Sequence, residues 1–369
     1  ANSTGIPKEV QLHVEGFSDE PTPAWLSVAE VPWTDTSART PVAAALPKVT
    51  PQGGTWSITV LPGLSRQAWL SLHVTDLPAG THSGAMVVES EGDDPVRIPF
   101  RVHVYPFTFP NQTTLLVGGW SYTNGKGTYG VTQENREAFL AHCQEHFVNA
   151  PWATRSPLMD FSFDADGNIH LDTNEMDDWL AQWPRAKKYF FFLGLGGLDR
   201  ATQQAFAGAK IGTPEFDQRV GAWISAWVEH WRSRGISPDR IVLHGHDEPR
   251  GEADAKSIIA WVQAIRAAAP EVLHWTDPVY VEPAMASPEL FEAFHILCPN
   301  RPMWLRGGPG FARFYRDQQR RGQTLHFYSC SGPARLLDPY SYYRLQAWHC
   351  WHVGATGSFF WAFGDNSGS

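Results

Sequence analysis

Ile241-Val-Leu-His-Gly-His-Asp-Glu-Pro-Arg250 is the stretch of sequence that decides the fold and points to a function. It begins as an apolar segment typical of a buried strand, and Pro249 stops that strand directly after two adjacent acids, Asp247 and Glu248. Neighbouring carboxylates at a strand end have to be solvated, paired or used in chemistry. In a barrel enzyme the C-terminal strand ends carry the catalytic groups, so this pair indicates acid–base chemistry on a sugar.

The pattern around this stretch predicts a (β/α)8 TIM-type barrel over residues 109–369, in which 241–244 is the fourth strand. The eight predicted strands are 114–118, 147–150, 189–194, 241–244, 272–275, 294–297, 324–328 and 358–363. The helical periods between them are 133–146, 175–183, 214–234, 252–269, 311–321 and 340–354. Residues 161–172 predict a hairpin inserted after the second strand, with its turn at 164–168. We expect the helix that would follow the eighth strand to be missing.

Residues 1–108 predict a separate all-β domain in front of the barrel. Strand-like segments at 56–61, 68–74, 84–89 and 96–104 are separated by clusters of Pro, Gly and Asp, as in an immunoglobulin-like sandwich. We expect no chemistry in this domain. The predicted fold class is therefore a multidomain protein, an N-terminal immunoglobulin-like sandwich followed by a (β/α)8 barrel.

Composition excludes several classes of partner and site. The net charge is −9 and no basic stripe is present, so we expect no nucleic-acid partner. No run of about 18 apolar residues occurs, so the sequence predicts no membrane-spanning helix. The four cysteines (143, 298, 330 and 350) have no CxxC spacing and are expected to be reduced thiols. No HExxH, P-loop or EF-hand pattern occurs, so we expect neither a metal nor an organic cofactor.

The other predicted strand ends of the barrel supply candidate substrate-binding residues. These candidates are Trp120, Tyr122, His246, Trp275, Asp277, Tyr280, Asn300, Tyr328 and Trp361. The sequence contains 17 Trp, more than usual, and aromatic faces serve as stacking platforms for sugars as well as filling cores. Trp120 and Tyr122 would either floor a sugar or pack beneath a loop. Asp277 would either bind a hydroxyl group or cap a turn.

Strand pleating sets one geometric requirement for the acid pair. In a regular strand His246 and Glu248 lie on one face and Asp247 lies on the other. Both acids reach one pocket only if the backbone is twisted or bulged at residues 246–248. Without that distortion, the two acids are solvated and cap the helix that starts near Glu252.

With these residues identified, positions 110–369 resemble glycoside hydrolase family 123, the exo-acting β-N-acetylgalactosaminidases, which carry a β-sandwich in front of the barrel. The resemblance rests on Asp247-Glu-Pro-Arg-Gly-Glu252, Tyr328-Ser-Cys-Ser-Gly-Pro333, Tyr343-Arg-Leu-Gln-Ala-Trp348 and Gly354-Ala-Thr-Gly-Ser-Phe-Phe-Trp361. It implies a glycan or glycoconjugate substrate and a secreted or periplasmic location. It leaves the aglycone, galacto or gluco configuration, exo or endo action and oligomeric state open.

The resemblance also implies a retaining, substrate-assisted mechanism, in which the 2-acetamido oxygen of the sugar attacks the anomeric carbon to give an oxazolinium ion. Glu248 would be the general acid and base, and Asp247 would orient the acetamido group. Glu248 then has to stay protonated near neutral pH, which an apolar pocket and a neighbouring carboxylate favour. Asp247 has to stay ionised, which a buried hydrogen-bond donor would favour.

Two alternatives remain open from the sequence. One is a retaining glycosidase acting on a sugar without an acetamido group, with Asp277 or Asp365 as a separate nucleophile about 5–5.5 Å from Glu248. The other is a carbohydrate-binding barrel protein that has no catalytic activity.

Overall fold

The computed structural model of the 369-residue chain describes residues 1–35, 39, 41–43, 45–74, 77–123, 130–153, 157–194, 205–330 and 344–363. They form two compact units. The first covers Ala1–Asn111, and the second begins at Gln112. None of the helices in the described part of the chain is long and apolar enough to cross a membrane.

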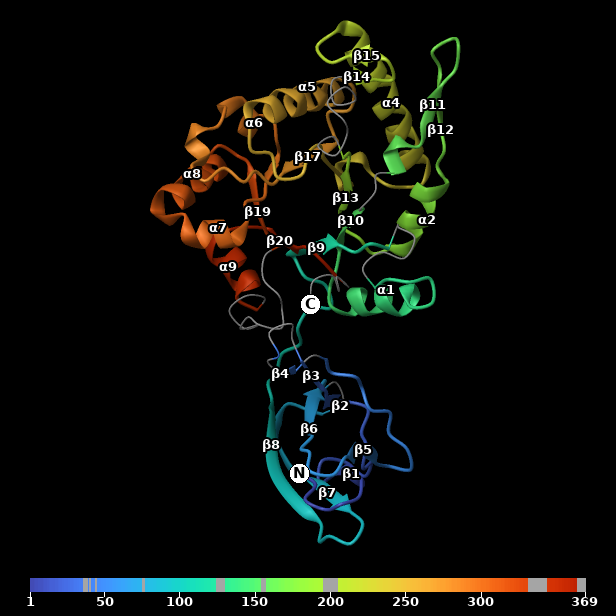
Figure 1. Cartoon of the computed structure of the whole chain (residues 1–369), viewed down its shortest axis with the longest axis vertical. Coiled ribbons are helices and arrows are strands. Elements are labelled where there is room, and N and C mark those ends of the chain that lie inside the picture. The colour runs from blue at the N-terminus through green and yellow to red at the C-terminus, as the bar shows by residue number, and fades with distance from the viewer. Residues whose placement is uncertain are drawn as a thin grey trace. The chain divides into compact units, whose positions relative to one another are not determined.

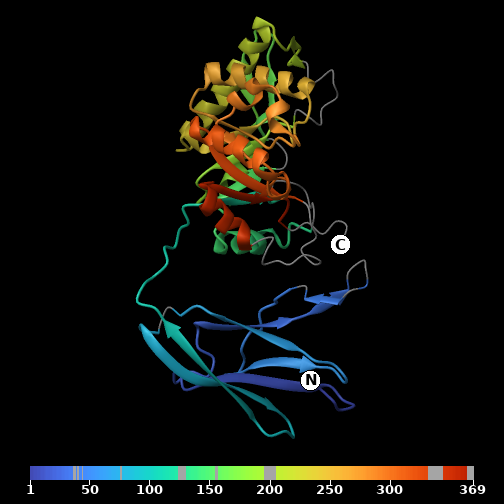
Figure 2. The same ribbon diagram turned by 90° about the vertical axis from the view of Figure 1, so that its left-hand side faces the viewer.

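The first unit is entirely β in its described residues (Figure 2). An antiparallel sheet has the order β5 (Trp56–Val60), β1 (Lys8–Glu15), β7 (Gly80–Ser90) and β8 (Val96–Val104). Two further pairs are β2 (Leu26–Val31) with β6 (Gln67–Leu72) and β3 (Trp33–Asp35) with β4 (Pro41–Ala43). The four predicted strands are confirmed, whereas β1 to β4 were not predicted. One core takes side chains from β1, β2, β5 and β7, including Leu12, Val28, Trp56 and Met86. The immunoglobulin-like assignment stays a prediction.

The second unit is a closed barrel of eight parallel strands (Figure 1), which confirms the predicted barrel. The strands are β9 (Leu116–Trp120), β10 (Ala150–Ala153), β13 (Tyr189–Phe192), β16 (Ile241–His244), β17 (Leu273–Thr276), β18 (Ile296–Leu297), β19 (Thr324–Ser329) and β20 (Gly357–Phe360). Pairing of β20 with β9 closes the barrel. Gly119 permits this closure, because a Cβ atom there would lie 2.0 Å from the Phe360 carbonyl oxygen on β20. Gly118 likewise permits the pairing of β9 with β10, because a Cβ atom there would lie 1.8 Å from the Ala150 carbonyl oxygen.

Helices surround these strands. The α-helices are α1 (Arg136–Glu145), α2 (Asn174–Gln182), α4 (Pro214–Ser233), α5 (Glu252–Ala268), α6 (Pro288–Glu292), α7 (Arg301–Arg306), α8 (Gly308–Arg320) and α9 (Leu345–Val353). The 3-10 helices are η1 (Pro157–Met159), η3 (Pro238–Arg240) and η4 (Pro283–Met285). The longest, α4, begins where the Thr213 side chain accepts a hydrogen bond from the backbone N–H of Phe216 and Pro214 occupies the first turn. The short helices α6 and α7 were not predicted.

Two hairpins project from the barrel. Strands β11 (Phe161–Phe163) and β12 (Ile169–Leu171) form the predicted insertion, in which the backbone N–H of Asp164 donates to the carbonyl of Asn168 at 2.9 Å. A second hairpin, β14 (Ala205–Phe206) with β15 (Ala209–Lys210), was not predicted. Residues 331–343, which include part of two quoted motifs, and residues 364–369, which include Asp365, lie outside the described residues.

Most of the tryptophans are core residues. Trp152 and Trp275 fill the inside of the barrel, with ring centroids 5.0 Å apart, and Phe359 stacks on Trp152 at 5.1 Å. A second group packs between strands and helices on the outside of the barrel: Trp179, Trp183, Trp223, Trp227, Trp231 and Trp261. The high tryptophan content therefore reports mainly on packing.

We predict that acid destabilises the barrel between about pH 6.5 and pH 3. Burial lowers the pKa of His244, His274 and His326 from 6.5 to about 3, because the interior disfavours the imidazolium. Between these pH values the three histidines bind more protons in the unfolded chain than in the folded one. Stability is therefore lost as the pH falls, by up to about 1.4 kcal/mol per histidine for each pH unit.

Urea unfolding of the parent and of His326→Gln at pH 7 and pH 5 measures this contribution. The raised pKa values of Asp247 and Asp277 act in the opposite direction and are common to both proteins. The substitution should flatten the pH dependence, and equal pH dependence in the two proteins would contradict the prediction.

Candidate active site

The backbone after β16 departs from a regular strand at the position that the sequence required. Glu248 has a φ of +49°, in the left-handed region that a non-glycine residue adopts at a cost of about 1–3 kcal/mol. Strand β16 ends at His244, and residues 246–248 bend before this left-handed residue, so that Asp247 and Glu248 do not follow the alternation of a regular strand. The predicted distortion at residues 246–248 is confirmed.

The Glu248 carboxylate is held from two sides. Its Oε1 atom accepts a hydrogen bond of 2.6 Å from the Tyr328 hydroxyl group on β19, and the Cys330 thiol lies 3.8 Å from the same oxygen. The Oε2 atom accepts from Arg250 Nη2 at 3.1 Å. About 28% of the Glu248 side chain stays exposed. The carboxylate is therefore oriented by its neighbours and still accessible to a ligand.

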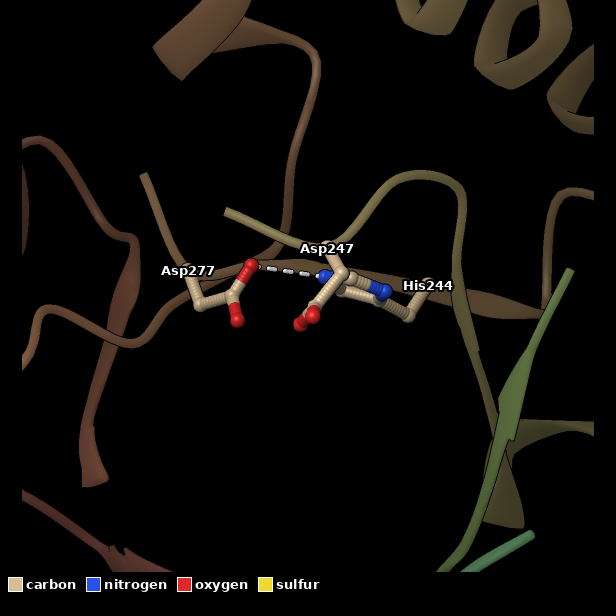
Figure 3. Close-up of side chains that lie close together, drawn as sticks. All are labelled: His244, Asp247 and Asp277. Carbon is tan, nitrogen blue, oxygen red and sulfur yellow. Dashed lines mark hydrogen bonds and ion pairs between the residues drawn. The ribbon is translucent and has the colours of Figure 1, made fainter. Parts of the chain in front are cut away.

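Asp277, at the end of β17, connects two strand ends (Figure 3). Its Oδ1 atom lies 2.8 Å from His244 Nε2 on β16 and accepts the backbone N–H of Glu248 at 3.0 Å. The Asp277 residue is 2% exposed, and this burial raises the pKa of its carboxyl group well above the usual value. His244 is neutral, because burial lowers its pKa to about 3. The Nε2–H tautomer then donates to Asp277.

Asp247 is the exposed member of this group. Atoms of Asp247, Asp277 and His244 lie within 4.8 Å of one another, and the Asp247 carboxyl group lies beside the hydrogen-bonded Asp277–His244 pair (Figure 3). The surrounding protein desolvates the Asp247 carboxyl group although the residue is accessible. This desolvation, with the nearby Asp277 charge as the second cause, raises the pKa of Asp247 to about 6.

The buried group beside Asp247 is thus a second carboxyl group, which raises the pKa of Asp247, and not the expected hydrogen-bond donor. A pKa of about 6 still leaves Asp247 mostly ionised at pH 7, as the hypothesis needs.

His244, Asp247 and Asp277 also have the donor types of a divalent-metal site. However, His244 Nε2 and Asp277 Oδ1 are already hydrogen-bonded to each other, so a cation would have to break that pair.

Three predicted aromatic residues meet at the ends of β9 and β20. The rings of Trp120 and Tyr122 stack with centroids 6.1 Å apart and an interplanar angle of 20°. The Trp361 indole N–H donates to the Tyr122 hydroxyl group. Trp120 and Trp361 are partly exposed, so this group provides an aromatic surface at the same end of the barrel as the acids.

Trp275 requires a correction. It was a candidate for stacking on a sugar, but it has 0% exposure and packs against Trp152 and His244 inside the barrel. The Trp275 side chain lies in the interior of the barrel and not at its opening. Trp275 therefore forms the floor beneath the site and cannot contact a ligand in this structure.

The remaining candidates make protein contacts. Asn300 is buried and caps α7 by accepting from the Met303 N–H at 3.2 Å. The Tyr280 hydroxyl group donates to the carbonyl of Gly251 at 3.3 Å.

The last candidate, His246, is paired with a helix residue: its Nε2 atom lies 3.4 Å from Asp254 Oδ1 on α5. Sequence reasoning missed the roles of His244, Arg250 and Cys330. Arg250 pairs with Glu248 within the same stretch, whereas the partner of His244, Asp277, comes from another strand.

No protein-family model and no curated protein sequence matches the chain. Among solved structures, it is similar to a family 123 glycoside hydrolase from Clostridium perfringens, studied for glycolipid glycan hydrolysis. The TM-score is 0.70 at 12% identity, over 98% of this chain and 70% of that one.

Two other structures show weaker similarity. A β-D-glucuronidase from Dictyoglomus thermophilum has a TM-score of 0.42 at 9% identity, over 96% of this chain and 57% of that one. A family 39 glycoside hydrolase from Bacteroides cellulosilyticus has a TM-score of 0.45 at 7% identity, over 95% and 72%. Neither score supports an argument. The first comparison shows that the chain has the fold of a family 123 glycoside hydrolase and so confirms the resemblance.

Proposed function

We propose that the protein is a retaining glycoside hydrolase that removes β-linked N-acetylhexosamine, most directly N-acetylgalactosamine, from a glycan or glycoconjugate. The observation that supports this proposal is the Asp247–Glu248 pair, which follows the fourth barrel strand and in which Glu248 has a left-handed conformation. A secreted or periplasmic location is part of the proposal and rests on the resemblance alone.

Glu248 acts as the general acid and base. In the first step the acetamido oxygen attacks the anomeric carbon, the bond to the leaving oxygen breaks, and Glu248 protonates that oxygen. In the second step Glu248 removes a proton from water as the water attacks the anomeric carbon and the oxazolinium ring opens. The hydrogen bond from Tyr328 fixes the orientation of the carboxyl group for both transfers.

Asp247 orients the acetamido group and stabilises its developing positive charge. Its carboxyl group is accessible, ionised above a pKa of about 6, and able to accept the acetamido N–H. A negative charge beside the oxazolinium ion stabilises the intermediate more than the neutral ground state. The aromatic surface of Trp120, Tyr122 and Trp361 would pack on the apolar face of the sugar ring.

A separate nucleophile at Asp277 is disfavoured. The side chain is almost fully buried, and its Oδ1 atom is occupied by His244 and by the Glu248 backbone. A nucleophile has to approach the anomeric carbon in line with the leaving group, which a buried and engaged carboxylate cannot do. Asp365, the other candidate nucleophile, lies outside the described residues.

A binding protein without catalytic activity would instead bind sugars across a broad panel without turnover.

Glu248→Gln is expected to lower kcat/KM for a 4-nitrophenyl β-N-acetylgalactosaminide by about 10²–10⁴-fold, because the amide neither donates nor accepts the transferred proton. Steady-state release of 4-nitrophenol measures this. Glu252→Gln is the matched control, since Glu252 is exposed and its ion pair is with Lys256 on the same helix. Activity of Glu248→Gln within a few-fold of the parent would reject Glu248 as the acid.

The rate is expected to fall as the pH drops below about 6. The raised pKa of Asp247 means that the carboxyl group gains a proton there and loses the charge that stabilises the oxazolinium ion. The pH profile of kcat/KM and inhibition by a thiazoline analogue of the intermediate measure this. Asp247→Asn should bind the thiazoline at least about 10²-fold more weakly.

Unchanged thiazoline inhibition in Asp247→Asn would count against the substrate-assisted mechanism. Both measurements are repeated after treatment with EDTA. Retained activity is expected there, because the His244–Asp277 hydrogen bond already uses two of the three potential metal-binding side chains.

A further inference from the structure

We propose that Asp277 is the positioning residue of this site: it holds Asp247 and Glu248 in one pocket and makes no contact with the substrate. Its effect on catalysis rests on the proposed function, whereas its effect on the conformation of the two acids does not.

The first argument is the hydrogen bond to the backbone of Glu248. The Glu248 N–H points at Asp277 Oδ1, 3.0 Å away, in a residue whose φ is +49°. A strained conformation persists only where the surrounding structure determines it. The acceptor comes from the neighbouring strand β17, so the conformation of the Asp-Glu pair depends on a residue 29 positions further along the chain.

The second argument is the contact with the side chain of Asp247. Oxygen atoms of the Asp247 and Asp277 carboxyl groups lie within 4.8 Å of each other, so that Asp277 binds the backbone of one acid and lies beside the side chain of the other. Asp277 is itself 2% exposed. It therefore reaches both catalytic candidates without access to a ligand.

The third argument is the fixed position of Asp277. His244 Nε2 donates to the same Oδ1 atom, and the His244 ring lies between Trp275 and Phe192, with centroids 4.4 and 4.3 Å away. Both residues of the Asp277–His244 pair are almost fully buried. A carboxylate held in this way gives the two acids a rigid reference point.

Two substitutions separate positioning from mere packing. Asp277→Asn keeps an oxygen that accepts from Glu248 and His244, and it removes the charge beside Asp247. Asp277→Leu has similar size and removes the acceptor. Asp239→Asn, at the opposite end of β16, is the control.

The titratable groups around Asp247 and Asp277 are His244, Glu248, Cys298, Tyr315, Tyr328 and Cys330.

The readouts are crystal structures and the titration of the ¹³C-labelled Asp247 carboxyl group, assigned with Asp247→Asn. Asp277→Asn should keep a positive φ at Glu248 and lower the pKa of Asp247, because the substitution removes the neighbouring Asp277 charge. The acid limb of the kcat/KM profile should move with it. Asp277→Leu should lose the positive φ and at least about 10²-fold in kcat/KM and thiazoline affinity.

A folded Asp277→Leu protein with a positive φ at Glu248 and parental activity would overturn the proposal, as would an Asp277→Asn protein that keeps the hydrogen bond to the Glu248 N–H and yet loses the positive φ. The Asn variant decides the matter if the Leu variant does not fold. The structures and the titration need no substrate. If the parent fails to cleave 2-acetamido sugars, the proposed function falls while these two measurements still test the role of Asp277.

Discussion

The site depends on one hydrogen bond, from the backbone N–H of Glu248 to Oδ1 of Asp277. It ties the end of β16 to the end of β17 and accompanies a left-handed glutamate where a strand would otherwise continue. Two adjacent residues on a regular strand present their side chains to opposite faces. An adjacent acid pair becomes a candidate catalytic pair only when the backbone is held away from that geometry.

The same arrangement gives the two acids different surroundings. Glu248 accepts hydrogen bonds from Tyr328 and Arg250 and reaches toward β19. Asp247 lies beside a buried carboxyl group, which together with desolvation raises its pKa to about 6. The aromatic floor below, with Trp275 against His244, keeps water away from this side of the site. Packing of the barrel interior and the ionisation of the site are therefore linked through desolvation.

The sequence predicted all eight barrel strands, because an apolar segment recurs before or after each helical period. The second strand was placed three residues early, since the left-handed φ of Phe147 delays its start to Ala150. Trp275 was assigned to the opening because a pattern with period two does not separate the barrel interior from its mouth. The role of Asp277 was ambiguous for a different reason: its partners depend on the register of β16 with β17, which sequence alone does not give.

Burial of Asp277 also bears on where the nucleophile comes from. A carboxylate that attacks an anomeric carbon needs an exposed oxygen, and Asp277 has neither exposure nor a free Oδ1 atom. Glu248 is needed for proton transfer, which leaves Asp247 as the other exposed carboxylate of this cluster. A protein nucleophile would therefore have to be Asp247, which could not then also orient the acetamido group. Attack by the acetamido group of the sugar itself removes this difficulty, because the protein then has to supply only a proton donor and a charge.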